Sequence, residues 1–181
     1  MKRIFLLLAL LSSAMATEQA FPPSPVDAAE LKTLPAGVLL KASAKGNYFD
    51  QSNRLFGPLF RYISSHDIAM TTPVEAKIEG AEMYFWVAKS EAAKVAGSTG
   101  DVEVVKIPER WVASLGARGS YSAQNFTKAR DRLVTWLSER KDVVAAGAPY
   151  AVYWNGPFTP GFLKRFEVHI PVRAADAAQI R

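Results

Sequence analysis

The stretch from residue 150 to residue 172 restricts the possible fold more than any other part of this chain. It begins with an aromatic and β-branched run at 150–154, which suits a half-buried strand. Residues 155–161 contain two prolines and two glycines, so neither a strand nor a helix continues through them. From 164 to 170 apolar and titratable side chains alternate, which places them on opposite faces of one strand.

The apolar face of this last strand carries Phe166, Val168 and Ile170, and the titratable face carries Arg165, Glu167 and His169. If the fold covers both faces, the titratable row lines a cavity. If it does not, the row belongs to a solvated sheet face, which is the commoner arrangement for a charged strand.

Periodicity along the rest of the chain predicts an α+β domain with two main helices. The first helix has a wide apolar stripe, with Gly57 and Pro58 in its middle, which predicts a kink or a restart at the proline. The second has apolar residues at regular helical spacing. Expected helices are 49–64 and 122–140, and expected strands are 38–45, 68–78, 83–88, 102–107, 110–118, 150–154 and 164–170.

A short internal repeat relates the two halves of the domain. The sequence KGNYFDQ at 45–51 matches RGSYSAQ at 118–124, and each copy follows a strand and opens a helix. Both halves then run in the order strand, helix, strand, strand. This organisation predicts a pseudo-twofold distorted β-barrel built from two such repeats.

The N-terminus has the features of a secretory signal peptide. Lys2 and Arg3 precede an apolar run at 4–11, and Ala14 and Ala16 have the spacing of a cleavage site. The run is too short to span a bilayer as a stable helix, so we expect no stable membrane insertion after processing. Cleavage after Ala16 predicts a periplasmic or secreted protein.

The processed chain is expected to hold one domain between two less regular segments. Residues 17–35 are proline-rich and predict an extended linker, with one possible helical turn at 27–32. The domain is expected at 36–172, and residues 173–181 are expected to form a C-terminal tail.

Charge and composition argue against several classes of protein. The net charge is +5, or +3 without Lys2 and Arg3, and the positive residues form no run or nucleic-acid motif, so nucleic-acid binding is not expected. The chain has no cysteine, and its two histidines lack the spacing of zinc ligands. No serine lies in the motif of a catalytic nucleophile.

Two motifs resemble those of a known family. Residues 153–157 (YWNGP), 159–160 (TP) and 164–168 (KRFEV) resemble the ending of the SOUL haem-binding proteins, and residues 67–74 (DIAMTTPV) resemble the other motif of that family. Phe166 stands where relatives usually have asparagine. The resemblance covers residues 36–172 and implies an α+β barrel, similar to the gyrase-inhibitor-like effector-binding domains.

The resemblance implies reversible, non-covalent binding of b-type haem or another tetrapyrrole in a hydrophobic groove, for carriage or buffering rather than as an enzyme. A tetrapyrrole is a flat apolar disc with anionic propionates, so apolar walls and a few cations suit it. In the family the groove runs along the first helix. The candidate residues for it here are Arg54, Phe56, Leu59, Phe60, Arg61 and Lys164.

The apolar candidates and the two histidines also have a purely structural interpretation. Phe56, Leu59 and Phe60 are equally suited to a core. His66 and His169 are possible axial ligands of haem iron, but His66 also suits a surface loop and His169 suits a polar partner of Glu167. The family need not share one axial ligand, and the sequence identifies no protein partner.

The alternative is a pocket protein for a cationic or electrophilic small molecule, possibly hydrolytic and using Glu167. A carboxyl group facing a barrel interior is expected to have its pKa raised by desolvation, which suits acid–base work. Tyr153 and Trp154 would complete the pocket. The competing interpretation of Glu167 is a buried salt bridge to Arg165 or a hydrogen bond within the sheet.

Overall fold

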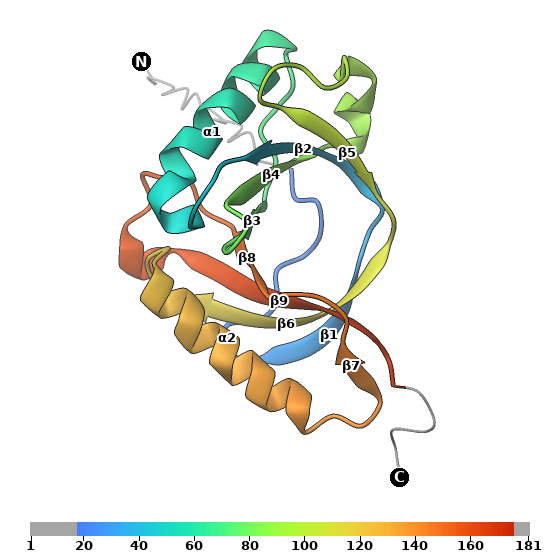
Figure 1. Cartoon of the computed structure of the whole chain (residues 1–181), viewed down its shortest axis with the longest axis vertical. Helices are drawn as coiled ribbons and strands as arrows, with labels where there is room; N and C mark the ends of the chain where they lie inside the picture. The colour runs from blue at the N-terminus through green and yellow to red at the C-terminus, as the bar shows by residue number, and fades with distance from the viewer. Residues whose placement is uncertain (1–17, 176–181) are drawn as a thin grey trace, which may run out of the picture.

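The computed structural model describes residues 18–175. Nine strands form one curled antiparallel sheet, and two long helices lie on its outer side (Figure 1). The helices are α1 (Tyr48–Ser65) and α2 (Ala123–Ser138), with short 3-10 turns at Lys89–Lys94 and Gly161–Leu163. The strands are β1 (Ala29–Leu34), β2 (Gly37–Ser43), β3 (Val74–Lys77), β4 (Glu82–Val87), β5 (Glu103–Ile107), β6 (Arg110–Arg118), β7 (Val143–Ala145), β8 (Tyr150–Tyr153) and β9 (Arg165–Ala174).

The strand order confirms the predicted pseudo-twofold architecture. Along the sheet the order is β1-β6-β9-β8-β3-β4-β2-β5, with β7 added beside β9. The second unit, β6-β9-β8, therefore meets the first unit, β2-β4-β3, in mirrored order at the β3–β8 pair. β1 precedes the first unit in sequence but pairs with β6, whereas β5 precedes the second unit but pairs with β2.

The repeated motif forms matching strand-to-helix connections. Gly46 and Gly119 each follow a strand with φ values of 104° and 131°, which favour glycine over any side chain. Asn47 and Ser122 then cap the two helices, accepting hydrogen bonds from the amides of Phe49 and Asn125. α1 runs through Pro58 as one helix, so the helix does not restart there.

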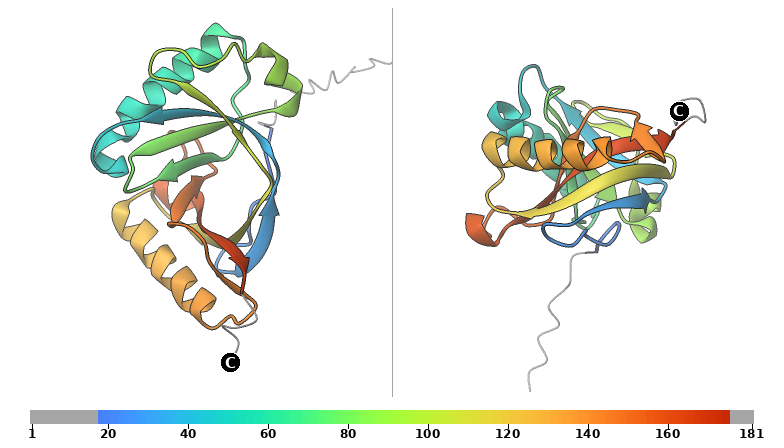
Figure 2. Two further views of the ribbon diagram at one scale, coloured as in Figure 1. Left: turned by 45° about the vertical axis from the view of Figure 1, so that its right-hand side comes forward. Right: turned by 90° about the horizontal axis from the view of Figure 1, so that it is seen from below.

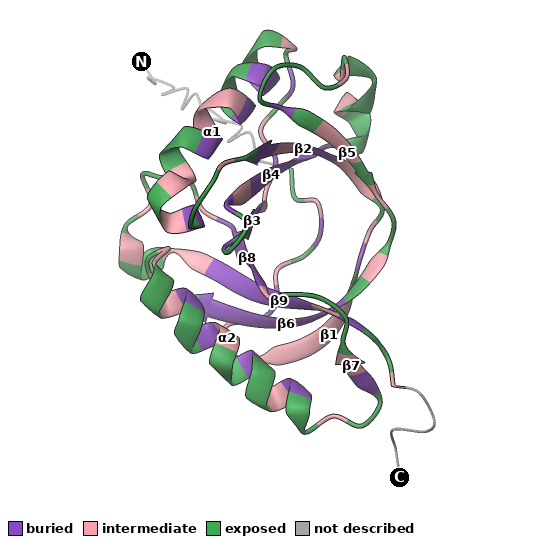
Figure 3. Ribbon diagram, viewed as in Figure 1, coloured by how far each residue is buried: buried purple, intermediate pink, exposed green. Residues whose placement is uncertain are grey.

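Alternation along the strands separates two apolar clusters. The larger cluster lies between the sheet and the helices and contains Leu59, Phe85 and Val168. The smaller cluster lies on the concave side of the sheet around Phe21, whose ring lies 5.6 Å from that of Trp86 and 5.5 Å from that of Trp154. Figure 3 shows the central strands buried and the outer faces of both helices exposed.

The N-terminal segment corrects the prediction of an extended linker at 17–35. Residues 29–34 form β1 instead of a helical turn, and residues 20–28 cross the concave side of the sheet (Figures 1 and 2). Phe21 and Ser24 are buried. A proline-rich sequence resembles a linker locally, but here its backbone bonds to distant strands, from Ala20 to Thr72 and from Asp27 to Gly116.

Smaller differences concern strand boundaries. The strand expected at 68–78 begins only at Val74, β7 has no predicted counterpart, and β9 reaches Ala174 within the expected tail. The predicted signal peptide and residues 176–181 lie outside the described residues. In residues 18–175 no helix has both the length and the apolar character needed to cross a bilayer.

Candidate functional site

One flank of α1 carries an aromatic pair that is partly buried against the sheet. The rings of Phe56 and Phe60 stack with centroids 5.6 Å apart and planes at 15°. Phe56 packs edge-on against Phe85 of β4, whereas Phe60 remains 48% exposed. Leu59 is fully buried and belongs to the core beneath the helix. Of the three apolar candidates on this helix, Phe60 alone presents a large surface to solvent.

The two candidate arginines of α1 lie together. Arg54 and Arg61 are exposed and line one cavity of about 350 Å³, which also includes Pro58 and Asp101. In residues 18–175 neither arginine forms an ion pair. Phe56 and Phe60 do not line this cavity, so the structure places the cations and the exposed aromatic surface on neighbouring sides of α1.

Lys164, the sixth candidate, lies in a different place. It follows the irregular connection between β8 and β9, and its ammonium group lies 4.8 Å from the ring centroid of Tyr121. Tyr121 precedes α2, and its ring stacks on that of Tyr153 at 4.1 Å.

Glu167 is enclosed rather than open to a ligand. Its side chain is 1% exposed and lies beneath the N-terminal segment on the concave side of the sheet. Oε1 accepts hydrogen bonds from the amide of Ser24 at 2.7 Å and from the indole of Trp154 at 2.9 Å. The partners of Oε2 are Ser24 Oγ (3.2 Å), Ser114 Oγ (2.9 Å), Lys32 Nζ (3.3 Å) and His169 Nε2 (2.6 Å).

These partners reverse the pKa shift expected for Glu167. Burial raises the pKa of the carboxyl group, but hydrogen bonding and charge from His169, together with Lys32 and the Ser24 amide, lower it to about 2. The salt bridge expected with Arg165 forms with Lys32 instead, and Arg165 donates to the Ser24 carbonyl. A carboxylate held ionised by so many donors is a weak general base, which argues against the acid–base role.

The two histidines differ in accessibility. His169 has no exposed surface, and its ring nitrogens contact Glu167 and the hydroxyl of Tyr150, so neither nitrogen is open to a metal. His66 caps the C-terminal end of α1 and stacks on Tyr62 at 4.3 Å. Its Nδ1 contacts Ser65 and Tyr62, while its Nε2 makes no hydrogen bond within residues 18–175.

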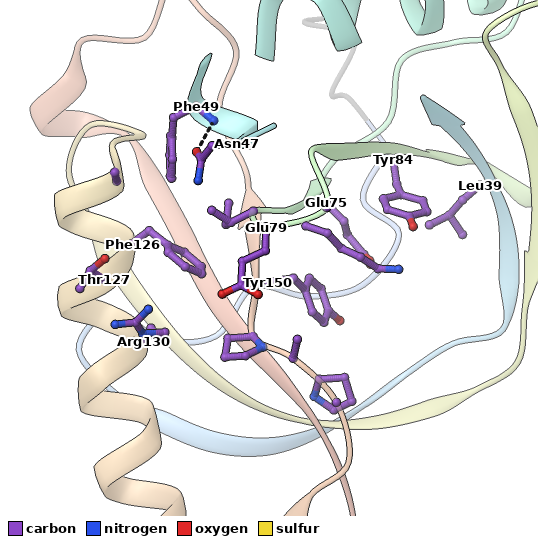
Figure 4. A pocket seen from close by; sticks show the side chains of 18 of the residues that line it. Leu39, Asn47, Phe49, Glu75, Glu79, Tyr84, Phe126, Thr127, Arg130 and Tyr150 are labelled. Atoms are coloured by element: carbon purple, nitrogen blue, oxygen red, sulfur yellow. Dashed lines mark hydrogen bonds between the residues drawn. The ribbon is translucent and has the colours of Figure 1, made fainter. Parts of the chain in front are cut away.

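A larger cavity opens at one end of the curled sheet. It has a volume of about 800 Å³ and lies between the two helices and the concave surface (Figure 4). Two of its charged groups pair with each other: Arg110 contacts Glu75 at 2.7 Å, and Glu75 also accepts from the indole of Trp86. Its lining includes Leu39, Phe49, Tyr84, Phe126 and Tyr150.

The sequence interpretation missed the residues that surround Glu167. Ser24 and Lys32 lie in the segment expected to be a linker, and Ser114 lies in the middle of a predicted strand. The one signal that could have identified Lys32 is its place in the alternation of β1, where Glu30, Lys32 and Leu34 share a face.

The comparison with solved structures shows the fold. The C-terminal domain of EcmrR has a TM-score of 0.64 and 15% identity, with 82% of this chain and 98% of that chain covered. An EcmrR chain in a DNA complex has a TM-score of 0.66 and 14% identity, with 82% of this chain covered. The match spans 58% of that EcmrR chain.

A third similar structure, a hydrolase from Listeria innocua, has a TM-score of 0.55 and 14% identity, covering 83% of this chain and 94% of that one. At these identities the similarity is one of fold, of the gyrase-inhibitor-like type. The comparison with curated proteins gives no match.

Family membership follows from the sequence motifs, the pseudo-twofold fold and a match of the whole domain. The SOUL heme-binding protein model matches residues 21–171, which include the N-terminal segment over the concave face as well as both repeats. The chain therefore belongs to the SOUL haem-binding protein family.

Proposed function

We propose that this protein binds haem, as non-covalent b-type haem, or a related tetrapyrrole reversibly at the flank of α1 where Phe60 is exposed, for carriage or buffering. Family membership supports tetrapyrrole binding. We choose this site because of Phe60, whose ring stacks on Phe56 while about half of its surface remains exposed to solvent. Such a surface offers a flat apolar disc a stacking partner already held in position.

The cations of α1 fit the anionic edge of a tetrapyrrole. Phe60 and Arg61 are consecutive, so their side chains leave the helix about 100° apart. The long side chain of Arg61 can therefore reach the edge of a disc that lies on Phe60. Arg54 and Arg61 have no carboxylate partner within residues 18–175, which leaves their guanidinium groups available for propionates.

His66 is the candidate axial ligand that the structure favours over His169. It lies six residues beyond Phe60, about 9 Å along the helix axis, and its Nε2 is free of hydrogen bonds to the described residues. A bound haem iron supplies an absorption spectrum that reports its axial ligands.

The alternative, a hydrolytic pocket built on Glu167, has less support. Its carboxylate has a pKa of about 2 and is covered by Ser24 and Lys32. A substrate would have to displace the N-terminal segment before it could meet this group. We therefore assign binding rather than turnover to this chain.

We further propose that the protein is exported and processed after Ala16, because residues 2–16 have the charge, the apolar run and the small residues of a signal peptide. Mass spectrometry of the mature protein should identify Thr17 as its first residue. An intact Met1 in the mature pool would contradict export by cleavage.

Titration of the purified protein with ferric haem tests the proposed function. We expect a saturable change of the Soret band with one haem bound per chain. His66→Ala should change the position of that band while leaving the protein folded. Haem that stays spectrally free at excess protein would overturn the proposal.

A further inference from the structure

Three large apolar side chains project from the connection between β8 and β9. Phe158 is 99% exposed, Phe162 76% and Leu163 49%. We call these three residues the apolar tip. Single exposed apolar residues are ordinary, but three within six positions of one loop indicate a surface that meets an apolar partner. In Figure 2 this loop projects from the body of the domain.

The base of this loop is fixed, so the apolar tip is held in place. The hydroxyl of Tyr121 accepts from the amide of Asn155 at 2.8 Å and donates to the carbonyl of Arg165 at 2.9 Å. The amide of Gly119 donates to the carbonyl of Lys164 at 3.0 Å. Pro157 and Pro160 further restrict the backbone. A pre-ordered loop loses little conformational entropy when its tip binds.

Two cations, Lys164 and Arg118, lie at the base of the apolar tip. Lys164 follows Leu163 directly, and Arg118 is exposed at the end of β6, where it pairs in register with Arg165. Within residues 18–175 neither Lys164 nor Arg118 forms an ion pair.

The starts of both helices flank the same loop (Figure 1). The first turn of α2 has no acidic residue to offset the partial positive charge of a helix N-terminus, whereas that of α1 contains Asp50. The surface around the apolar tip therefore favours an anionic partner.

We propose that the apolar tip docks the protein onto an anionic lipid bilayer. A protruding apolar tip suits a deformable lipid interface better than a preformed protein pocket, and aromatic side chains with cations behind them match the boundary between acyl chains and headgroups. Phe158, Phe162 and Leu163 enter this boundary, while Lys164 and Arg118 meet anionic headgroups. The docking is peripheral and does not depend on the tetrapyrrole site of α1.

Co-sedimentation with lipid vesicles tests this proposal, using residues 17–181, which contain every described element. Vesicles of phosphatidylcholine are compared with vesicles that also contain phosphatidylglycerol. The protein should sediment with the anionic vesicles and be released by salt, because screening weakens the headgroup contacts. The Phe158→Ser, Phe162→Ser double variant should lose about tenfold or more of this binding.

Val134→Ser is the control, because Val134 is a single exposed apolar side chain on α2, with 48% exposure, outside the apolar tip. It should bind vesicles like the unchanged protein, and Lys164→Glu should reduce the preference for anionic lipid. Equal vesicle binding by the double variant and the unchanged protein would overturn the proposal. The proposal would also be overturned if the unchanged protein did not bind vesicles and the double variant lost haem affinity. The tip would then belong to the tetrapyrrole site.

Discussion

The backbone amide of Ser24 donates a hydrogen bond to Oε1 of Glu167 across 2.7 Å, although 143 positions separate the two residues. The contact joins the first described segment of the chain to its last strand. It also contributes, after His169 and Lys32, to the lowered pKa of Glu167, because an amide donor favours the ionised carboxylate. The N-terminal segment is thus a structural part of the domain.

Gly116→Ala should loosen this segment from the sheet. A Cβ at Gly116 would overlap the carbonyl of Pro25 and lie 2.9 Å from the carbonyl oxygen of Ser24. Backbone cannot move away as a flexible side chain does, so we expect a loss of about 1–3 kcal/mol in the free energy of unfolding, measured by urea denaturation.

Gly156→Ala provides the control for this substitution, since a Cβ there meets no atom within 4 Å. Its free energy of unfolding should stay within about 0.5 kcal/mol of the unchanged protein. Equal stability of the Gly116 and Gly156 variants would show that residues 20–28 do not pack on β6 in solution.

Acid should destabilise the fold through Glu167. The carboxyl group has a pKa of about 2 in the folded chain against an ordinary value of 4.5. Because the folded-state pKa is depressed, this stabilisation is complete above pH 4.5 and is lost as the pH falls toward 2. The pKa of His169 is lowered by burial, so charging of His169 in the unfolded chain adds to the loss as the pH falls below about 6.5.

Urea unfolding at a series of pH values measures this dependence. Glu167→Gln should be less stable at neutral pH and should show a smaller slope of unfolding free energy between pH 2 and 4.5. Glu139→Gln, which removes an exposed carboxylate at the end of α2, is the control and should keep the slope of the unchanged protein. A Glu167→Gln variant with an unaltered slope would contradict the pairing described for the concave face.

Phe60→Glu should weaken haem binding by at least about tenfold, because it places an uncompensated charge against an apolar ligand. Val134→Glu introduces the same charge at a side chain of the same 48% exposure on α2, so it separates a local effect from a change in net charge. Ferric haem titration of both variants measures the difference. If the two variants bind equally well, the tetrapyrrole lies elsewhere.

The Arg54→Ala, Arg61→Ala double variant should weaken haem binding several-fold without moving the Soret band. An exposed charge pair contributes up to about 1 kcal/mol, which is about fivefold in Kd. The propionates lie at the edge of the disc, away from the iron, so the axial ligand should be unaffected. Lys128→Ala, which removes an exposed cation from α2, should leave the affinity unchanged.

An unchanged affinity in the arginine double variant would place the propionates elsewhere, with Lys164 and Arg165 next to be tested. A moved Soret band would show that the arginines also position the iron.

Sequence periodicity predicted the elements whose patterns are local. β6 was expected at 110–118 and is found there, and the ends of both helices differ from the expected ones by one or two residues. In β9 the apolar side chains face the larger core and the titratable ones face the other side of the sheet, as the alternation predicted. The repeated glycine-containing motif led to the pseudo-twofold barrel because each copy forms the same strand-to-helix connection. These features depend on neighbours within a few residues.

The surroundings of Glu167 depend on residues far away in sequence, and they were not predictable from local pattern. Burial alone would raise the pKa of this carboxyl group, and that was the expectation. The pKa of Glu167 is lowered instead because of His169, Lys32 and Ser24. Of these three residues, only His169 is close to Glu167 in sequence. The packing of the segment that contains Ser24 was not predicted, because the prolines at 22, 23 and 25 indicate an extended chain but not what that chain contacts.

Because β1 and β5 are exchanged between the two units, neither unit contains all of its own strand partners. A single unit, such as residues 29–87, would hold a first strand whose pairing partner is missing and a second strand with an unpaired edge. Two copies of such a unit would complete each other by exchanging first strands, as in a domain-swapped homodimer. The present chain holds both units covalently, so each unit supplies the first strand with which the other one pairs, and the pairing does not depend on protein concentration as it would in such a dimer.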